Sequence, residues 1–191
     1  MITISAFKWV PPFAQGQVRD LRVRWTLEEA GLPYRVRLID AEDQASAGYR
    51  ALQPFGQVPI FEEDGLVLFE SGSIVLHIGE RSEMLLPTDG AARARAITWL
   101  FAALNTIEVA IQPLAEIDLF HAGEDWAKAR RPDAEQPVKR RLAELAARLG
   151  DRGYLEDSFT AGDLMMTTVL RILRHTDLVE IEPKLHAYKE L

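Results

Sequence analysis

Two short groups of residues carry the chemistry that this sequence suggests: Gln57-Val58-Pro59 and Glu70-Ser71. An X-Pro bond adopts the cis form at a cost of only about 0.5–1 kcal/mol, and a cis turn would leave the N–H and C=O of Val58 facing outward for an added extended peptide. A helix beginning near Ser71 offers free N–H groups and a positive dipole end to a carboxylate. Together they suit a short acidic peptide, although a buried hairpin and a capped helix would use the same residues without a ligand.

A β-hairpin followed by a helix must position these groups. Val58–Glu62 alternates and is rich in β-forming residues, and Leu66–Phe69 is a second apolar run. Asp64-Gly65 between two such runs is a strong hairpin signal, and Pro59, which has no N–H, fits only the start or the edge of a strand. Beyond the hairpin the apolar residues change to helical spacing, and Ser71 is placed to cap that helix.

The rest of the first half predicts a small α/β domain. The expected elements are a strand at 2–7, a loop at 8–16, a helix at 18–30, a strand at 34–39 and a short helix at 46–51. A strand, helix and strand joined by a crossover give a parallel pair, and the hairpin adds antiparallel strands. This is the order of a thioredoxin-like domain over residues 1–80, followed by a polar linker at 81–90.

Residues 91–191 predict an all-helical domain. Apolar residues recur at three- and four-residue steps along Ala91–Glu116, and Val138–Leu149 forms a second helix after a charged loop that contains Arg130-Arg131-Pro132. Thr160 and Asp163 have the spacing of a capping box. The apolar stripe behind them predicts the central helix of a bundle.

Taken together, these patterns resemble the glutathione S-transferase family. The resemblance rests on Gln57-Val58-Pro59 within Pro54–Pro59, on Glu70-Ser71, on VRWTLEEAGLPY at 23–34, on the cap at 160–163 and on PKLHAYKEL at 183–191. It covers essentially the whole chain. Members of the family usually continue for about one more helix, by analogy, so we expect the natural chain to extend beyond residue 191.

The resemblance implies a fold, a co-substrate and a set of site residues. It implies that Val58 pairs with the cysteinyl backbone of glutathione beside Gln57 and Pro59, and that Glu70 and Ser71 hold the γ-glutamyl end. It also implies a cytoplasmic homodimer that acts in detoxification, with glutathione and a small hydrophobic electrophile as its small-molecule partners. The electrophile pocket would be formed by Trp9, Phe13, Phe101 and Asn105.

The usual catalytic hydroxyl of that family is absent. Between Phe7 and Arg24 there is no Tyr, Ser, Thr or Cys, whereas the resemblance implies a thiolate-stabilising donor in this region. Gln17, Arg19 and Lys8 are the candidate donors among the side chains, and the backbone N–H groups at the first helix are a further candidate. Three functions stay open: a conjugating transferase, a glutathione-binding module with little catalysis, and a glutathione-dependent isomerase.

The composition argues against several kinds of partner and site. The net charge of −7 argues against nucleic acid as a partner. The chain has no Cys and only four His, which excludes disulfides, Cys-ligated metals and a Cys nucleophile and predicts no metal site. We expect no membrane partner, because no apolar run near the roughly 18 residues of a membrane helix is evident.

Overall fold

The computed structural model describes residues 1–189 and contains two compact units, Met1–Leu86 and Pro87–Leu191. The division falls inside the segment 81–90 that the sequence predicts as a linker. Leu85 and Leu86 are buried, and the side chain of Leu86 lies against Gly79. The first half of the predicted linker therefore belongs to the core of the first unit.

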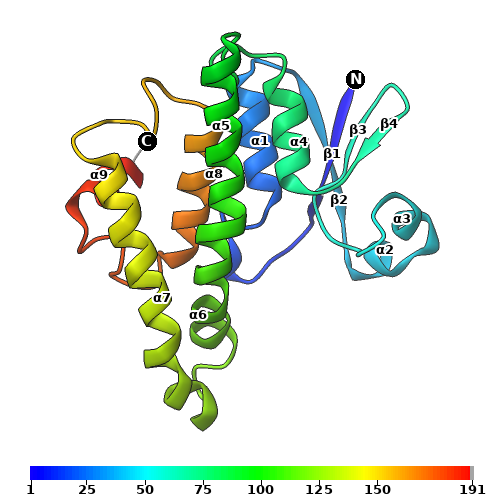
Figure 1. Ribbon diagram of the computed structural model, residues 1–191. Helices are drawn as coiled ribbons and strands as arrows, with labels where there is room; N and C mark the ends of the chain where they lie inside the picture. Colours follow the sequence, from blue (N-terminus) through cyan, green and yellow to red (C-terminus); the bar gives the residue numbers. More distant parts are fainter. Residues whose placement is uncertain (190–191) are drawn as a thin grey trace. The chain divides into compact units, whose positions relative to one another are not determined.

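The first unit is built on a four-stranded mixed sheet (Figure 1). The strands are β1 (Ile2–Phe7), β2 (Tyr34–Ile39), β3 (Phe61–Glu63) and β4 (Leu66–Leu68), in the spatial order β2-β1-β3-β4. β1 runs parallel to β2 and antiparallel to β3, and β3 pairs antiparallel with β4. The parallel pair and the hairpin around Asp64-Gly65 are as predicted.

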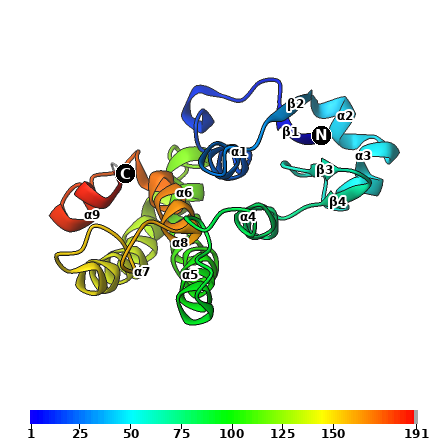
Figure 2. The same ribbon diagram turned by 90° about the horizontal axis from the view of Figure 1, so that it is seen from above.

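Helices cover both faces of this sheet, as Figure 2 shows. On one face lie α1 (Asp20–Glu29) and α4 (Ser71–Gly79), which pack against the strands through a core cluster of Ile2, Ile4, Val23, Leu27, Phe61, Ile74 and Ile78. On the other lie the short helices α2 (Ala41–Ala45) and α3 (Ala47–Leu52). A smaller cluster there contains Ile39, Tyr49, Val58 and Ile60. The unit has the three layers of a thioredoxin-like domain.

Three local predictions in this unit need correction. Strand β3 begins at Phe61 rather than Val58, because Pro59 cannot donate to a ladder. A 3-10 turn, η1 (Pro12–Ala14), lies in the first loop, and α1 spans Asp20–Glu29 instead of 18–30. Helix α2 was not predicted; the side chain of Asp40 caps it by accepting from the N–H groups of Glu42 and Asp43.

The second unit is helical throughout its regular structure. Its elements are α5 (Gly90–Ala102), a π-helical segment η2 (Ala103–Glu108), α6 (Val109–Phe120), α7 (Asp125–Leu149), α8 (Ala161–Leu170), a 3-10 turn η3 (Arg171–Leu173) and α9 (Pro183–Lys189). All ten residues of α8 are buried, so α8 is the central helix of the unit, as predicted. The predicted late helix begins at Pro183, and its last two residues, 190 and 191, lie outside the described part.

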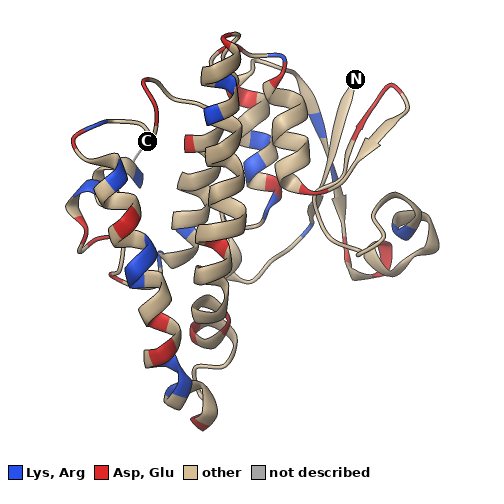
Figure 3. Ribbon diagram, viewed as in Figure 1, with Lys and Arg blue, Asp and Glu red and all other residues tan. Residues whose placement is uncertain are grey.

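Helix α7 overturns the predicted charged loop around Arg130-Arg131-Pro132. It runs unbroken through Pro132 and Pro137, although each proline removes a helical hydrogen bond. Ion pairs hold this stretch: Arg131 contacts Glu135 within α7 and Asp118 on α6. Figure 3 shows the alternating charges along α7. The pair with Asp118 joins α7 to α6, and the sequence around Pro132 does not reveal this contact between the two helices.

The stretch Gly90–Phe120 corrects the expectation that no apolar run is long enough to cross a membrane. By length and composition alone, these 31 residues pass that test, and 33% of the most apolar window is buried. A core helix of a soluble protein passes the same test. In the second unit α5 packs against α8, and α6 packs against α7, so part of this stretch is covered by other helices of the same unit.

Candidate functional site

The loop before β3 presents an open main chain at Val58. The Val58-Pro59 peptide bond is cis, the form considered for this bond in the sequence. Among residues 1–189, no hydrogen-bond partner is found for the N–H or C=O of Val58, although Val58 is only 7% exposed. The neighbouring Ile60 is satisfied on both sides by Ser5. Since nearly all buried main-chain groups in proteins are paired, Val58 is suited to a main-chain ligand.

Glu70 has an unusual backbone conformation at the start of α4. Its φ of 69° and ψ of 112° are strained for a side chain other than glycine. The pairing of Phe61 with Leu68 places Glu70 at the same end of the hairpin as Pro59. Strain of this kind costs about 1–3 kcal/mol and clusters at functional sites.

Ser71 is the first helical residue of α4, and the predicted capping role is wrong. Glu70 occupies the N-cap position, and no side chain caps the helix there. The hydroxyl of Ser71 instead accepts a hydrogen bond of 3.3 Å from Arg22 of α1. Arg22 is 4% exposed. A buried guanidinium beside the positive end of α4 makes this corner favourable for an anion.

The N-terminus of α1 lies after the loop in which a thiolate donor was expected. Gln17 is half-buried in a turn, with its N–H bonded to the carbonyl of Ala14 at 3.0 Å. Arg19 occupies the N-cap position, again without a side-chain cap, and is exposed. Burial raises the pKa of Asp20, the first residue of α1, while nearby Arg24 opposes that rise. The start of α1 and the turn before it therefore bring together backbone N–H groups, the guanidinium of Arg19 and the amide of Gln17, and residues 8–23 contain no hydroxyl side chain.

Lys8, the third candidate donor, is engaged elsewhere. Its ammonium group lies 2.6 Å from Asp40 and 3.7 Å from Asp43, at the start of α2. The hydrogen bond from Lys8 is the main cause that lowers the pKa of Asp40 to about 2. The hydrogen bond to Asp40 likewise raises the pKa of Lys8. Two carboxylates therefore hold the ammonium group of Lys8 at the start of α2.

The residues predicted for the electrophile pocket are exposed aromatic and polar side chains. Trp9 is 75% exposed, Phe13 36% and Phe101 47%, and Asn105 is also exposed. Trp9 borders a hollow of about 340 Å³ in the first unit, lined mainly by apolar side chains between the end of β1 and α2. Trp9 and Phe13 belong to the first unit, and Phe101 and Asn105 to the second. Their joint pocket stays a prediction.

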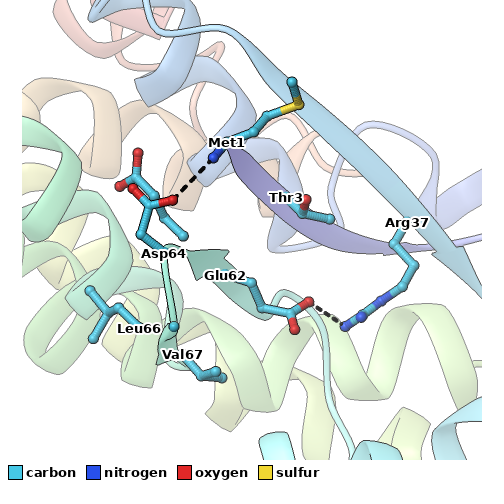
Figure 4. Close-up of a pocket in the computed structure, with 9 residues that line it drawn as sticks. Met1, Thr3, Arg37, Glu62, Asp64, Leu66 and Val67 are labelled. Atoms are coloured by element: carbon cyan, nitrogen blue, oxygen red, sulfur yellow. Dashed lines mark hydrogen bonds and ion pairs between the residues drawn. The ribbon is translucent and has the colours of Figure 1, made fainter.

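A second hollow of the first unit, about 340 Å³, lies beside the β3–β4 turn (Figure 4). Its two cationic groups are paired with lining carboxylates: Arg37 with Glu62 at 2.8 Å, and the N-terminal ammonium of Met1 with Asp64 at 3.4 Å. The third lining carboxylate, Glu63, pairs with Arg81, which does not line the hollow. It shares no lining residue with the Val58 and Glu70 region. Because its two cationic groups are already paired and its lining carries three carboxylates, it is a less suitable anion site than the start of α4.

Three contributors to the site were not predicted: Arg22, Ser5 and Tyr49. Tyr49 donates to the carbonyl of Gln57 at 2.7 Å, and Ser5 accepts from the N–H of Ile60 at 2.7 Å. The one sequence signal for Ser5 and Arg22 is that each is a polar residue at a position where the apolar pattern predicts burial. Ser5 falls at an inner position of an apolar strand, and Arg22 lies among apolar residues of α1. Neither position marks its partner, which is distant in sequence.

Comparison with known proteins identifies relatives of this chain. Residues 14–80 match the family model described as the N-terminal domain of glutathione S-transferase. A glutathione S-transferase from Hyoscyamus muticus is 31% identical over 172 residues, which cover 82% of this chain and 78% of the relative.

Solved structures share the whole fold. Glutathione transferase F7 from Populus trichocarpa superposes with a TM-score of 0.83 at 23% identity, over 100% of this chain and 92% of that one. A glutathione transferase from Burkholderia graminis, solved with two glutathione molecules bound per subunit, gives a TM-score of 0.84 at 25% identity, over 99% of this chain and 82% of that one. With the thioredoxin-like unit, the helical unit and the relative from Hyoscyamus muticus in agreement, this chain belongs to the glutathione S-transferase family.

Proposed function

We propose that this protein binds glutathione and transfers its thiolate to a small apolar electrophile. The observation that carries the proposal is the strained Glu70 at the uncapped start of α4, at the same end of the hairpin as the unpaired main chain of Val58. Such an arrangement can bind two different parts of one tripeptide, its main chain at Val58 and its charged end at the start of α4. The membership of the family and the glutathione bound to the relative from Burkholderia graminis support it.

The proposed site divides glutathione between two elements. The N–H and C=O of Val58 pair with the cysteinyl backbone, in the manner of an added strand, and Gln57 and Pro59 fix that loop. The carboxylate of Glu70 pairs with the γ-glutamyl ammonium group. The γ-glutamyl carboxylate meets Ser71 and the free N–H groups of α4.

The reaction requires a thiolate at neutral pH. A free thiol has a pKa near 8.5, and each unit of lowering needs about 1.4 kcal/mol of preferential thiolate stabilisation. Gln17, Arg19 and the N–H groups at the start of α1 are the proposed sources. The thiol proton passes to solvent, the sulfur forms a bond to the electrophilic carbon, and a leaving group such as halide departs with its electron pair. Trp9, Phe13, Phe101 and Asn105 are proposed to hold the electrophile.

A second candidate is a glutathione-binding module with little catalysis. It is favoured by one observation, the absence of any hydroxyl or thiol side chain between Phe7 and Arg24. A glutathione-dependent isomerase uses the same binding site without a net transfer. Conjugation of a standard aryl halide separates these functions: robust turnover excludes the binding module, whereas binding without turnover supports it.

The test of the site is a double substitution at Glu70 and Ser71. We expect glutathione binding, measured by calorimetry, to be lost on changing both residues to Ala. A matched control changes Ser82 and Glu83 to Ala, the same residue types in the segment just after α4. Equal binding by the Glu70/Ser71 variant and the wild type would overturn the assignment.

We further infer a cytoplasmic homodimer with a role in detoxification. All three inferences rest on membership of the family. The homodimer is also supported by two exposed apolar residues of the Gly90–Phe120 segment, Phe101 and Val109. A light-scattering mass on gel filtration tests the dimer. A mass of one chain, 21.5 kDa, at micromolar concentration would contradict it.

A further inference from the structure

A chain of hydrogen bonds links the two ends of the loop that carries Val58. The hydroxyl of Tyr49, on α3, donates to the carbonyl of Gln57 at 2.7 Å. The N–H of Ile60 donates to the hydroxyl of Ser5, on β1, at 2.7 Å. The hydroxyls of Ser5 and Tyr49 lie 3.0 Å apart. The loop is thereby bracketed immediately before and two residues after Val58.

The direction of every proton in this chain follows from the groups present. A carbonyl can only accept, so the single proton of the Tyr49 hydroxyl is given to Gln57. Tyr49 therefore accepts from Ser5, and Ser5 uses its remaining lone pair for the N–H of Ile60. The order is Ile60 N–H to Ser5, Ser5 to Tyr49, and Tyr49 to the carbonyl of Gln57. Hydrogen bonds in such a series strengthen one another.

The two hydroxyls are protected from water. Ser5 is 1% exposed and Tyr49 6% exposed, and Tyr49 belongs to the cluster that includes Val58 and Ile60. Buried hydroxyls that are fully paired fix a single geometry, and loss of one member leaves its neighbours unsatisfied. The main chain of Val58, between the two bracketed ends, keeps its N–H and C=O unpaired.

We propose that Ser5 and Tyr49 are positioning residues for glutathione, which hold Gln57 and Ile60 so that the main chain of Val58 is set to receive the cysteinyl backbone. Neither side chain touches the ligand in this scheme. The inference rests on the proposed function, because it concerns the same docking edge. It assigns a binding role to two residues that are 44 positions apart in the sequence.

The test uses two ligands and one substitution. Glutathione and an analogue methylated at the cysteinyl nitrogen, which cannot donate to the carbonyl of Val58, are titrated into the wild type and Tyr49→Phe by calorimetry. The matched control is Tyr34→Phe, which removes the hydroxyl that donates to Glu28 at 2.9 Å in the same unit.

Tyr49→Phe is expected to weaken glutathione binding by about 2–13-fold, the equivalent of one hydrogen bond of 0.5–1.5 kcal/mol. Methylation should weaken binding less in Tyr49→Phe than in the wild type. In the variant a displaced Val58 carbonyl forms a poorer hydrogen bond with the cysteinyl N–H, so less affinity is lost when methylation removes that donor. Tyr34→Phe should behave as the wild type. An unchanged affinity, or a methylation penalty equal in both proteins, overturns the positioning role. Failure of the wild type to bind glutathione overturns the proposed function and this inference together.

Amide hydrogen exchange of the wild type gives a second measurement that needs no variant. Without ligand, the N–H of Ile60 should be protected and that of Val58 should exchange faster; glutathione should slow the exchange of Val58. Fast exchange at Ile60, or a Val58 amide already protected without ligand, contradicts the bracketed loop.

Discussion

The ammonium group of Lys8 lies 2.6 Å from the carboxylate of Asp40, and this pair joins the end of β1 to the start of α2. The carboxylate also accepts from the N–H groups of Glu42 and Asp43. Asp40 is thus the cap of a helix and the partner of a cation at once. The pair also keeps the ammonium group of Lys8 beside α2.

The first prediction concerns the titration of Asp40. Its pKa is lowered from 3.8 to about 2, first by the hydrogen bond from Lys8. A carboxylate with a lowered pKa in the folded state adds stability above its unfolded value, and that contribution is lost as the pH falls through about 2. In Lys8→Met the carboxyl carbon of Asp40, followed by NMR, should titrate at a higher pH. The same midpoint in both proteins would contradict the pairing.

The second prediction separates the candidate thiolate donors. An amide hydrogen bond to charged sulfur contributes about 1.5–3 kcal/mol, so Gln17→Ala should raise the pKa of bound glutathione thiol by about one unit or more. Lys8→Met should leave that pKa unchanged, because carboxylates hold Lys8. The thiolate absorbance of the complex against pH measures both. A shift in Lys8→Met with none in Gln17→Ala would reverse the assignment.

The third prediction uses the backbone of Glu70. With φ at 69°, Glu70→Gly removes the strain and Glu70→Ala keeps it, while both remove the carboxylate. We expect the Gly variant to be more stable than the Ala variant by about 1 kcal/mol in urea unfolding, after allowing for the greater entropy of an unfolded glycine. Both should bind glutathione more weakly than the wild type. Wild-type affinity in Glu70→Gly would show that the carboxylate takes no part.

Local signals predicted those parts of the fold whose cause is local. Asp64-Gly65 predicted the hairpin, and Thr160 with Asp163 predicted the capping box, because each involves neighbours within a few residues. Helix α7 was missed at Pro132 because a proline predicts a helix break, whereas the packing of α7 against α6, which includes the pair of Arg131 with Asp118 13 residues away, is not local in the sequence.

In the candidate site, too, the local motif was predicted from the sequence and the tertiary contacts were not. The motif around Val58 and Ser71 is contiguous and was visible in the sequence, although its residue roles rest on the family. Tyr49 and Ser5 were not predicted as site residues, because they contact the Val58 loop only once α3 and β1 have packed beside that loop. A hydroxyl at an apolar strand position carries no mark of the residue that it will bond.

The fourth prediction concerns the close approach of α5 and α8 in the second unit. A methyl group on Gly162 would lie 2.6 Å from Cβ of Trp99 and 3.0 Å from the carbonyl oxygen of Ala96. Helix propensity alone would make Gly162→Ala stabilising by up to about 1 kcal/mol, whereas overpacking costs about 1–3 kcal/mol. We expect a net loss of stability in urea unfolding. Gly123→Ala, where the added methyl meets nothing within 4 Å, is the control and should change stability little.

The fifth prediction concerns Asp163, the most heavily used buried carboxylate among the described residues. It is 0% exposed and accepts from the N–H of Leu155 at 2.8 Å, from the N–H and hydroxyl of Thr160 at 2.9 and 3.0 Å, and from the hydroxyl of Tyr188 at 2.9 Å. It therefore ties the loop before α8 and helix α9 to the start of the central helix.

Asp163→Ala leaves these donors unpaired in the interior. Each buried donor without a partner costs about 1–3 kcal/mol, so we expect a loss of at least about 3 kcal/mol in urea unfolding. Tyr188→Phe is the graded control. Burial raises the pKa of Tyr188, so its hydroxyl stays protonated and donates a single hydrogen bond, and its loss should cost about 1 kcal/mol. If Asp163→Ala is no less stable than Tyr188→Phe, the cap contributes only one of these contacts, and the central helix is held by its apolar burial instead.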